Sequence, residues 1–330
     1  MADGVLPAHA VIVAPELDGD EADEAAVEQR EATVTAVQHG ERLDKAIVAF
    51  VPEFSRSHLQ QLIRGGCVAL DGAPAKSPAH RVRAGQRVAV RLQPTAESRA
   101  YRAEVLPLTV VHEDADVLVI DKAAGMVVHP APGNWSGTVL NALLARDPAS
   151  AALPRAGIVH RLDKDTSGLM VVGRTLAAVT ALVRAIAARE VHRRYLAIAH
   201  GAPPQEHWSI EAPIGRDPRV RTRMAVVASG KPARTDVDRI AVAAKFAALR
   251  CTLHSGRTHQ IRVHLAHDGW PLVGDRLYGG APALGIERQA LHAHELAFTH
   301  PGSGAKLSFR APPPSDFAHA WDEVVAAGGP

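Results

Sequence analysis

Two amphipathic helices and two short strands are predicted near the start of the chain. The first helix ends at Pro52, and the second begins at Ser55, a favourable N-cap, and stops at a pair of glycines. Cys67–Leu70 and Arg87–Leu92 follow as strand-like runs. The apolar helix faces consist of Leu43, Ile47 and Phe50 in the first helix and Leu59, Leu62 and Ile63 in the second.

Strand patterns dominate from Val105 onward. Leu176–Glu190 is the strongest predicted helix in this region. The strands come in runs and do not alternate regularly with helices. This pattern favours an α+β fold, with a mixed, largely antiparallel central sheet and flanking helices, over a doubly wound fold. The helix is marked by Leu176, Val179, Val183 and Ile186, and the strands are expected at Val117–Ile120, Leu169–Val172, Tyr195–Ala199, Phe246–Leu253 and Leu307–Phe309.

Charge is distributed unevenly along the chain, although the net charge is only +2. Residues 1–40 hold nine acidic residues and one basic residue, which leaves 36 Lys/Arg and 26 Asp/Glu, a net +10, in residues 41–330. We expect the acidic segment 1–40 to be disordered. A basic body suits a polyanionic partner, with an ordinary soluble surface as an equal alternative.

Other sequence features exclude several classes of protein. No run of eighteen apolar residues predicts a membrane span, and no secretory signal pattern is present, so we expect a cytoplasmic protein. Cys67 and Cys251 are far apart and have apolar or small neighbours, which predicts buried free thiols. No CxxC, HExxH or GxxxxGK[ST] pattern occurs, so neither a metal site nor nucleotide hydrolysis is expected. A monomer is the default expectation.

The segment 157–168 is the densest in potential chemistry. Asp163 and Asp165 stand two residues apart, with Arg161 and Lys164 beside them, and an apolar strand follows. A loop of two carboxylates, two cations and two hydroxyls between apolar runs is usually functional, with a solvated turn as the alternative. The neighbouring cations favour ionised carboxylates, which can act as nucleophiles or bases.

A second polar segment, residues 254–264, follows a strand and begins a helix. Ser255 and Gly256 suit a helix entry, and the N-terminus of that helix could receive a phosphate. If the helix begins at Arg257, Arg262 lies more than one turn in and could face a carboxylate. The available donors are Arg257, His259, Gln260 and Arg262, and the histidines His254, His259, His264 and His267 match no metal-binding spacing.

These segments resemble the signatures of a known enzyme family. Residues 160–168, His-Arg-Leu-Asp-Lys-Asp-Thr-Ser-Gly, are similar to the signature of the RluA family of RNA pseudouridine synthases. Residues 121–130 resemble its first motif, with Ala123 where proline is usual, and residues 194–197 resemble its tyrosine motif. Residues 255–264 and 273–275 resemble its C-terminal motif, residues 41–92 resemble the S4 RNA-binding domain, and residues 129–141 are most similar to the RluD-like branch.

The resemblance implies a domain organisation and a set of partners. Residues 41–100 would form an S4-like α/β RNA-binding domain with a linker, and residues 101–330 a catalytic domain with the pseudouridine synthase fold. The RluD-like branch acts on large-subunit ribosomal RNA. The implied substrate is therefore 23S ribosomal RNA or an assembling large subunit, with no cofactor and no metal.

The resemblance also implies residue roles. Asp163 would attack the sugar, or abstract its 2′ proton, while the uracil leaves, turns and bonds through C5 to C1′. Tyr195 would stack on the uracil and is a candidate to assist removal of the C5 proton, and Arg262 would pair with Asp163. Arg161 would fill the place of the extruded target nucleotide, since the glycosidic bond cannot be approached within a stack. Further candidate RNA contacts are His160, Arg257, His259 and Gln260, with Arg56 and Arg64 in the S4-like region.

Two other functions compete with this one. The chain could be a non-catalytic RNA-binding factor in ribosome assembly, although retention of Asp163, Tyr195, Arg257 and Arg262 argues against a dead enzyme. It could also be a hydrolase with an aspartate nucleophile, but the sequence offers no clear pair of groups to activate water and supply a proton.

Overall fold

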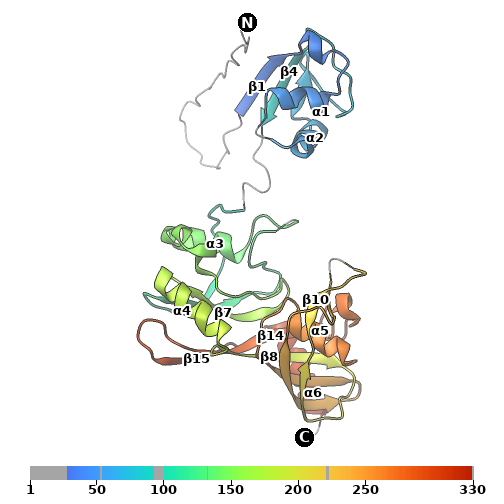
Figure 1. Cartoon of the computed structure of the whole chain (residues 1–330). Coiled ribbons are helices and arrows are strands. Elements are labelled where there is room, and N and C mark those ends of the chain that lie inside the picture. Colours follow the sequence, from blue (N-terminus) through green and yellow to red (C-terminus); the bar gives the residue numbers. More distant parts are fainter. Residues whose placement is uncertain (1–27, 53, 93–99, 132, 221–222, 329–330) are drawn as a thin grey trace. The chain divides into compact units, whose positions relative to one another are not determined.

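The computed structural model describes residues 28–52, 54–92, 100–131, 133–220 and 223–328. The chain divides between Arg99 and Ala100 into two compact units (Figure 1). The acidic run Asp18–Glu24 and most of the expected linker Gln93–Arg102 lie outside the described residues.

The smaller unit is built on a four-stranded antiparallel sheet in the order β1-β4-β2-β3. Disorder was the wrong expectation for residues 28–40, because β1 (Glu28–Thr33) pairs along its whole length with β4 (Arg87–Leu92). The backbone of β1 gains these hydrogen bonds from a partner more than fifty residues away, and local composition cannot predict such a pairing. The other strands are β2 (Val68–Leu70) and β3 (Ala73–Pro74).

The helices of the smaller unit bury the predicted apolar faces against this sheet. The first expected helix is split into α1 (Leu43–Ala46) and a 3-10 turn, Ile47–Ala49. The second, α2 (Arg56–Arg64), begins as predicted at Ser55, whose Oγ accepts a hydrogen bond from the backbone of His58. A further 3-10 turn spans Ala36–Gln38.

One buried carboxylate ties the two helices of the smaller unit together. Asp44 is fully buried and accepts hydrogen bonds from Arg42, from Arg56 at 3.0 Å and from Gln60 at 2.6 Å. The hydrogen bond from Arg42 lowers the pKa of Asp44 well below its usual range, and the bonds from Arg56 and Gln60 add to the effect. Arg56, predicted to contact RNA, therefore also holds the fold together.

The larger unit has a nine-stranded sheet. Eight of its strands follow the order β5-β6-β7-β14-β8-β13-β12-β9, and the ninth, β15, pairs with β14. Only the contact of β14 with β7 is parallel, so the predicted mixed, largely antiparallel sheet is confirmed. The strands are β5 (Thr109–Glu113), β6 (Val117–Lys122), β7 (Ser167–Gly173), β8 (His192–His200), β9 (His207–Glu211), β12 (Arg234–Ala243), β13 (Phe246–Leu253), β14 (Leu291–Thr299) and β15 (Lys306–Arg310), and β10 (Ile214–Arg216) and β11 (Met224–Val226) form a separate hairpin.

Four α-helices flank this sheet, with α4 packed on β7 and α6 packed on β12 and β13 (Figure 1). In α4 the buried face consists of Ala178, Val179 and Leu182, whereas Leu176 and Val183, two of the predicted face residues, are exposed. The helices are α3 (Val139–Arg146), α4 (Leu176–Ala187), α5 (Gln260–His267) and α6 (Ser315–Ala327), and 3-10 turns span Pro148–Ala152, Pro154–Gly157 and Arg276–Tyr278.

Two further expectations can be compared with the described residues. Cys67 and Cys251 are buried free thiols, as predicted. Among the described helices, none combines the length and the apolar character that crossing a membrane requires.

The parallel contact of β7 with β14 depends on a glycine. Gly168 has a φ of +113°, and a Cβ there would lie 2.3 Å from the carbonyl oxygen of Ala293 on β14. We expect Gly168→Ala to lower the free energy of unfolding by about 2–4 kcal/mol, more than the ~1–2 kcal/mol of left-handed backbone strain alone. Urea unfolding checks this prediction. Gly269→Ala is the matched control, because its φ is +90° and nothing lies within 4 Å of the added methyl. Equal losses in the two variants would contradict the role of the strand contact.

Candidate active site

The loop of residues 159–166, called the Asp163 loop, runs from Ile158 to the start of β7. Ile158 itself pairs with Val172 of β7 in an isolated bridge. The backbone of the loop is anchored on both sides. The Asp163 carbonyl accepts from the Thr166 amide at 3.1 Å, and the carbonyl of Asp165 accepts from Arg288 at 2.9 Å. The loop is therefore a fixed platform for the carboxylate of Asp163 and not a mobile surface turn.

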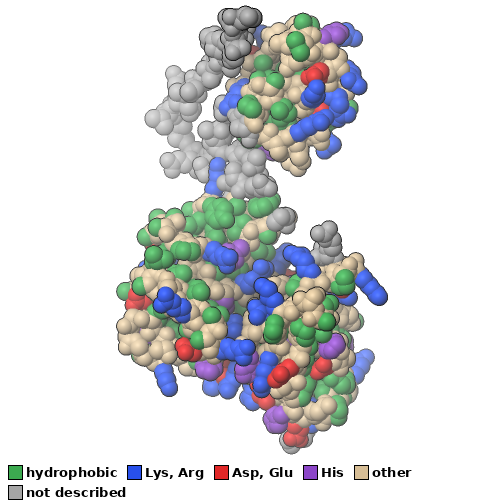
Figure 2. All heavy atoms as spheres, viewed as in Figure 1, with side chains coloured by type: hydrophobic (Ala, Val, Ile, Leu, Met, Phe, Trp, Pro, Cys, Tyr) green, Lys and Arg blue, Asp and Glu red, His purple; other side chains and the backbone are tan. Residues whose placement is uncertain are grey.

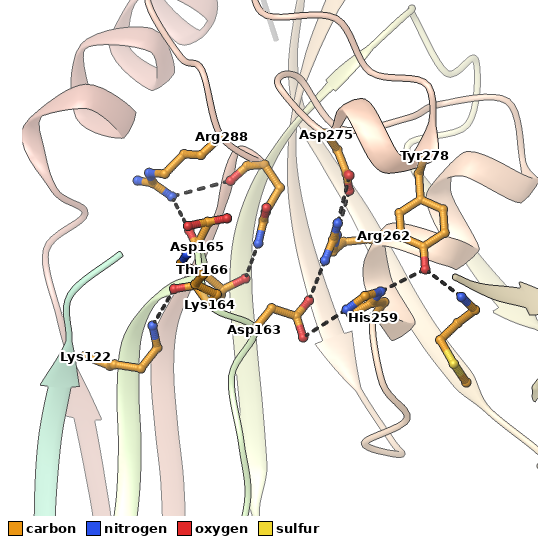
Figure 3. A network of polar contacts seen from close by, with 12 residues as sticks. Lys122, Asp163, Lys164, Asp165, Thr166, His259, Arg262, Asp275, Tyr278 and Arg288 are labelled. Carbon is orange, nitrogen blue, oxygen red and sulfur yellow. Dashed lines mark hydrogen bonds and ion pairs between the residues drawn. The ribbon is translucent and has the colours of Figure 1, made fainter. Parts of the chain in front are cut away.

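Lys122, at the end of β6, supplies the most buried of these anchors (Figure 3). Its ammonium donates to three carbonyls, those of Ala123 at 2.8 Å, Met126 at 2.9 Å and Lys164 at 3.0 Å. Burial lowers the pKa of Lys122 to about 8. Three donors meet three acceptors, so this lysine joins the first motif to the Asp163 loop.

A chain of ion pairs holds the Asp163 carboxylate (Figure 3). Arg262 on α5 donates to Asp163 at 3.0 Å and, through two other nitrogens, to Asp275 at 2.7 and 2.9 Å. The side chains of Arg262 and Asp275 are 7% and 1% exposed. Burial alone would lower the pKa of Arg262, but hydrogen bonds and charge from Asp275 and then Asp163 raise it above its usual value. The guanidinium is thus a permanent cation with a fixed orientation.

A histidine and a tyrosine complete the wall beside Asp163. The Tyr278 hydroxyl accepts from the backbone amide of Met224 at 3.1 Å and lies 2.8 Å from His259 Nδ1. His259 Nε2 lies 3.9 Å from Asp163 Oδ1. Burial lowers the pKa of His259, so the ring that faces Asp163 is neutral.

The second polar segment folds differently from the expectation. Helix α5 begins at Gln260, three residues later than predicted, because His259 takes a left-handed conformation with φ +56°. The Gln260 side chain accepts from Ser255 and the Arg257 amide and donates to the Arg234 carbonyl and to Thr235. All of its hydrogen-bonding capacity is used within the protein, which argues against the predicted RNA contact.

Asp163 lines a cavity of about 740 Å³. Among the described lining residues Asp163 is the single carboxylate, and Figure 2 shows Lys and Arg side chains gathered over the middle of the larger unit. A cavity with this charge balance suits a polyanion. The lining arginines are Arg155, Arg161, Arg189, Arg193, Arg257 and Arg262.

The remaining predicted site residues also line this cavity. Tyr195 on β8 is 5% exposed, and burial raises the pKa of its phenol, so the hydroxyl is protonated at neutral pH. Arg161 and Arg257 are exposed at the rim, and Arg257 Nε also donates to the Pro232 carbonyl. His160 has a different task, because its Nε2 accepts from the Val171 amide of β7 at 3.0 Å.

Sequence reasoning missed four residues that hold Asp163 in place. Asp275 stood in the segment that resembles the C-terminal motif, and its position there could have marked it. Lys122 stood likewise in the first motif. Tyr278 and Arg288 had no sequence signal, because they reach the Asp163 loop and its neighbours only through the tertiary fold. Arg56 and Arg64 belong to the smaller unit.

The comparison with known proteins identifies the family of this chain. Residues 116–267 match the family described as RNA pseudouridylate synthase, and residues 41–88 match the S4 domain. A relative from Xanthomonas campestris pv. campestris, "Ribosomal large subunit pseudouridine synthase D", is 48% identical over 300 residues, covering 87% of this chain and 90% of the relative. The chain belongs to the RNA pseudouridylate synthase family.

Other members of the family extend this result. A protein of the same name from Neisseria meningitidis serogroup B is 44% identical over 316 residues, covering 92% of this chain and 84% of the relative. The solved structure "Human RNA Pseudouridylate Synthase Domain Containing 1" aligns with a TM-score of 0.52 and 26% identity, covering 72% of this chain and 91% of that one. The resemblance inferred from the motifs, the fold class and the S4 domain are thereby confirmed.

The orientation of Arg262 depends on a residue that does not face the cavity. Asp275→Asn would keep the shape of the side chain but weaken the grip on Arg262. We expect a 10- to 100-fold lower kcat with little change in KM, because small misplacements of a reacting group cost about this much. Steady-state kinetics on RNA provide the measurement. Glu287→Gln, at an exposed partner of Arg276, is the control, and a similar loss there would contradict the assignment.

Proposed function

We propose that the protein converts specific uridines of large-subunit (23S) ribosomal RNA to pseudouridine. The observation that carries the proposal is the Asp163 carboxylate, held by Arg262 at 3.0 Å, within a cavity lined by arginines. The relatives from Xanthomonas and Neisseria are named for the large ribosomal subunit, which supports this choice of RNA.

The resemblance to the family implies the roles that we propose for the cavity residues. Asp163 attacks the sugar at C1′ or abstracts the 2′ proton, and the C1′–N1 bond breaks. The freed uracil turns, C5 bonds to C1′, and the proton on C5 is lost while N1 gains one, so atoms and electrons balance without an oxidant or water. Tyr195 stacks on the uracil, and its protonated hydroxyl is available to assist at C5. Arg161, exposed at the rim, takes the place of the extruded nucleotide.

The S4 domain provides a second RNA contact in this proposal. Residues 41–100 carry ten Lys/Arg against five Asp/Glu, and Arg64 is exposed at the end of α2. A monomer is the oligomeric state in this proposal. Because bacterial ribosomal subunits assemble in the cytoplasm, the protein would act there.

A non-catalytic assembly factor is the competing function. It would have no use for a carboxylate whose backbone is anchored by Lys122 and Arg288 and whose side chain is paired with Arg262. An anchored, paired carboxylate in a cavity is the arrangement that covalent or acid–base catalysis requires. The geometry therefore favours the enzyme.

Replacement of Asp163 tests the proposed function directly. Asp163→Asn keeps the shape and removes the nucleophile or base, so tritium release from C5-labelled uridine in 23S rRNA should fall at least 1,000-fold, roughly the scale on which a missing catalytic group acts. RNA binding should persist. Asp165→Asn is the control and should lose much less. Turnover of Asp163→Asn within tenfold of wild type would refute the assignment.

The contribution of the S4 domain can be read from salt dependence. Each phosphate that a protein cation neutralises makes the slope of log affinity against log salt steeper by about 0.7–0.9, so losing one such contact makes it shallower by the same amount. We expect Arg64→Gln to reduce the slope by about this amount in filter binding to an rRNA fragment. Arg276→Gln, an exposed arginine of the larger unit outside the cavity lining, should leave the slope unchanged. Identical slopes for Arg64→Gln and wild type would remove this arginine from the RNA contact.

A further inference from the structure

Arg193 differs from its neighbour on the same strand. Successive side chains of a strand point to opposite faces. In β8, Arg194 is half exposed and pairs with Glu295 of β14 at 3.1 Å. Arg193 points to the same side as Tyr195, lines the Asp163 cavity and is only 7% exposed.

The Arg193 guanidinium has no partner within the described part of the protein. Its Nε is buried and makes no hydrogen bond, and no carboxylate of the described residues forms an ion pair with it. Arg262 in the same cavity is comparably buried but holds two carboxylates. An isolated buried cation is costly, and proteins normally compensate it with an opposite charge.

The described surroundings of Arg193 leave its guanidinium facing the cavity, whose single described carboxylate, Asp163, is paired with Arg262. Arg193 Nη1 lies against Gly256, where an added Cβ would stand 3.0 Å away. His160 and Tyr195 are close enough for its charge to act on them, and both are uncharged at neutral pH: burial and then Arg193 lower the pKa of His160 to about 3, and burial raises that of Tyr195. An anionic group of a bound substrate would compensate this charge.

We propose that Arg193 binds a backbone phosphate of the RNA segment that carries the reacting uridine. The inference rests on the proposed function, which brings RNA into this cavity. A phosphodiester supplies one full negative charge and two oxygens, which match the planar guanidinium. A uracil carbonyl would satisfy one N–H but leave the buried charge uncompensated. Arg193 is thus a substrate-binding residue that fixes the nucleotide between Tyr195 and Asp163.

A charge-deletion cycle tests this pairing without turnover. Asp163→Asn serves as background, so that the RNA stays unmodified, and the probe is an rRNA stem-loop that the wild-type enzyme modifies. The phosphate on the 5′ or the 3′ side of the target uridine is replaced, in turn, by a neutral methylphosphonate. Dissociation constants are measured for each RNA with and without Arg193→Gln.

We expect Arg193→Gln to weaken binding of the native RNA by about 10- to 100-fold, the usual range for a hydrogen bond to a charged group. One methylphosphonate should weaken binding to a similar extent, and the two changes together should cost no more than either alone. Arg194→Gln, the control, should behave like the background protein with every RNA. Additive losses at both linkages would overturn the proposal.

Stability separates a binding role from a structural one. Removing an uncompensated buried charge should leave the urea midpoint of Arg193→Met unchanged or higher. A clearly lower midpoint would mean that Arg193 supports the fold, and would also overturn the proposal. Tritium release by the wild-type protein judges the proposed function separately, because neither the binding cycle nor the unfolding experiment depends on catalysis.

Discussion

The ion-pair chain from Asp163 through Arg262 to Asp275 is the constraint on which the site depends. It joins the loop before β7 to helix α5 and to the turn after it, segments that are separated by about a hundred residues in the chain. Arg262 is the common cationic partner of both carboxylates, so its removal would leave two carboxylates at this site without an opposite charge. The position of the reacting carboxylate is therefore fixed by the fold of the whole larger unit.

The backbone around Asp163 is fixed by a second, separate set of contacts. Lys122 and Arg288 bind loop carbonyls from opposite sides of the loop, and Gly168 allows β7 to approach β14 (Figure 3). These contacts hold main-chain atoms, whereas Arg262 holds the side chain. Catalytic groups held on both levels need little rearrangement when the substrate arrives.

The cavity has an excess of positive charge that the protein leaves largely uncompensated. Arg262 is paired, but Arg193 is buried without a partner among the described residues, and Asp163 is the single carboxylate in the described lining. Leaving a cation buried and unpaired lowers the stability of the free protein. A polyanionic substrate would recover this cost on binding, so the charge imbalance favours RNA over a neutral ligand.

The family, the α+β class and the candidate nucleophile can be predicted from the sequence, because they depend on local motifs and on the period of apolar residues. The sequence placed Asp163 and Arg262 together only as an implication of the resemblance. Four features became visible only in the folded chain: the hydrogen bonds of Gln260 are all made within the protein, α5 begins late, β1 joins the S4 sheet, and Tyr278 reaches His259. Each of these depends on partners distant in the chain, and hydrogen-bond satisfaction between distant segments leaves no periodic trace in the sequence.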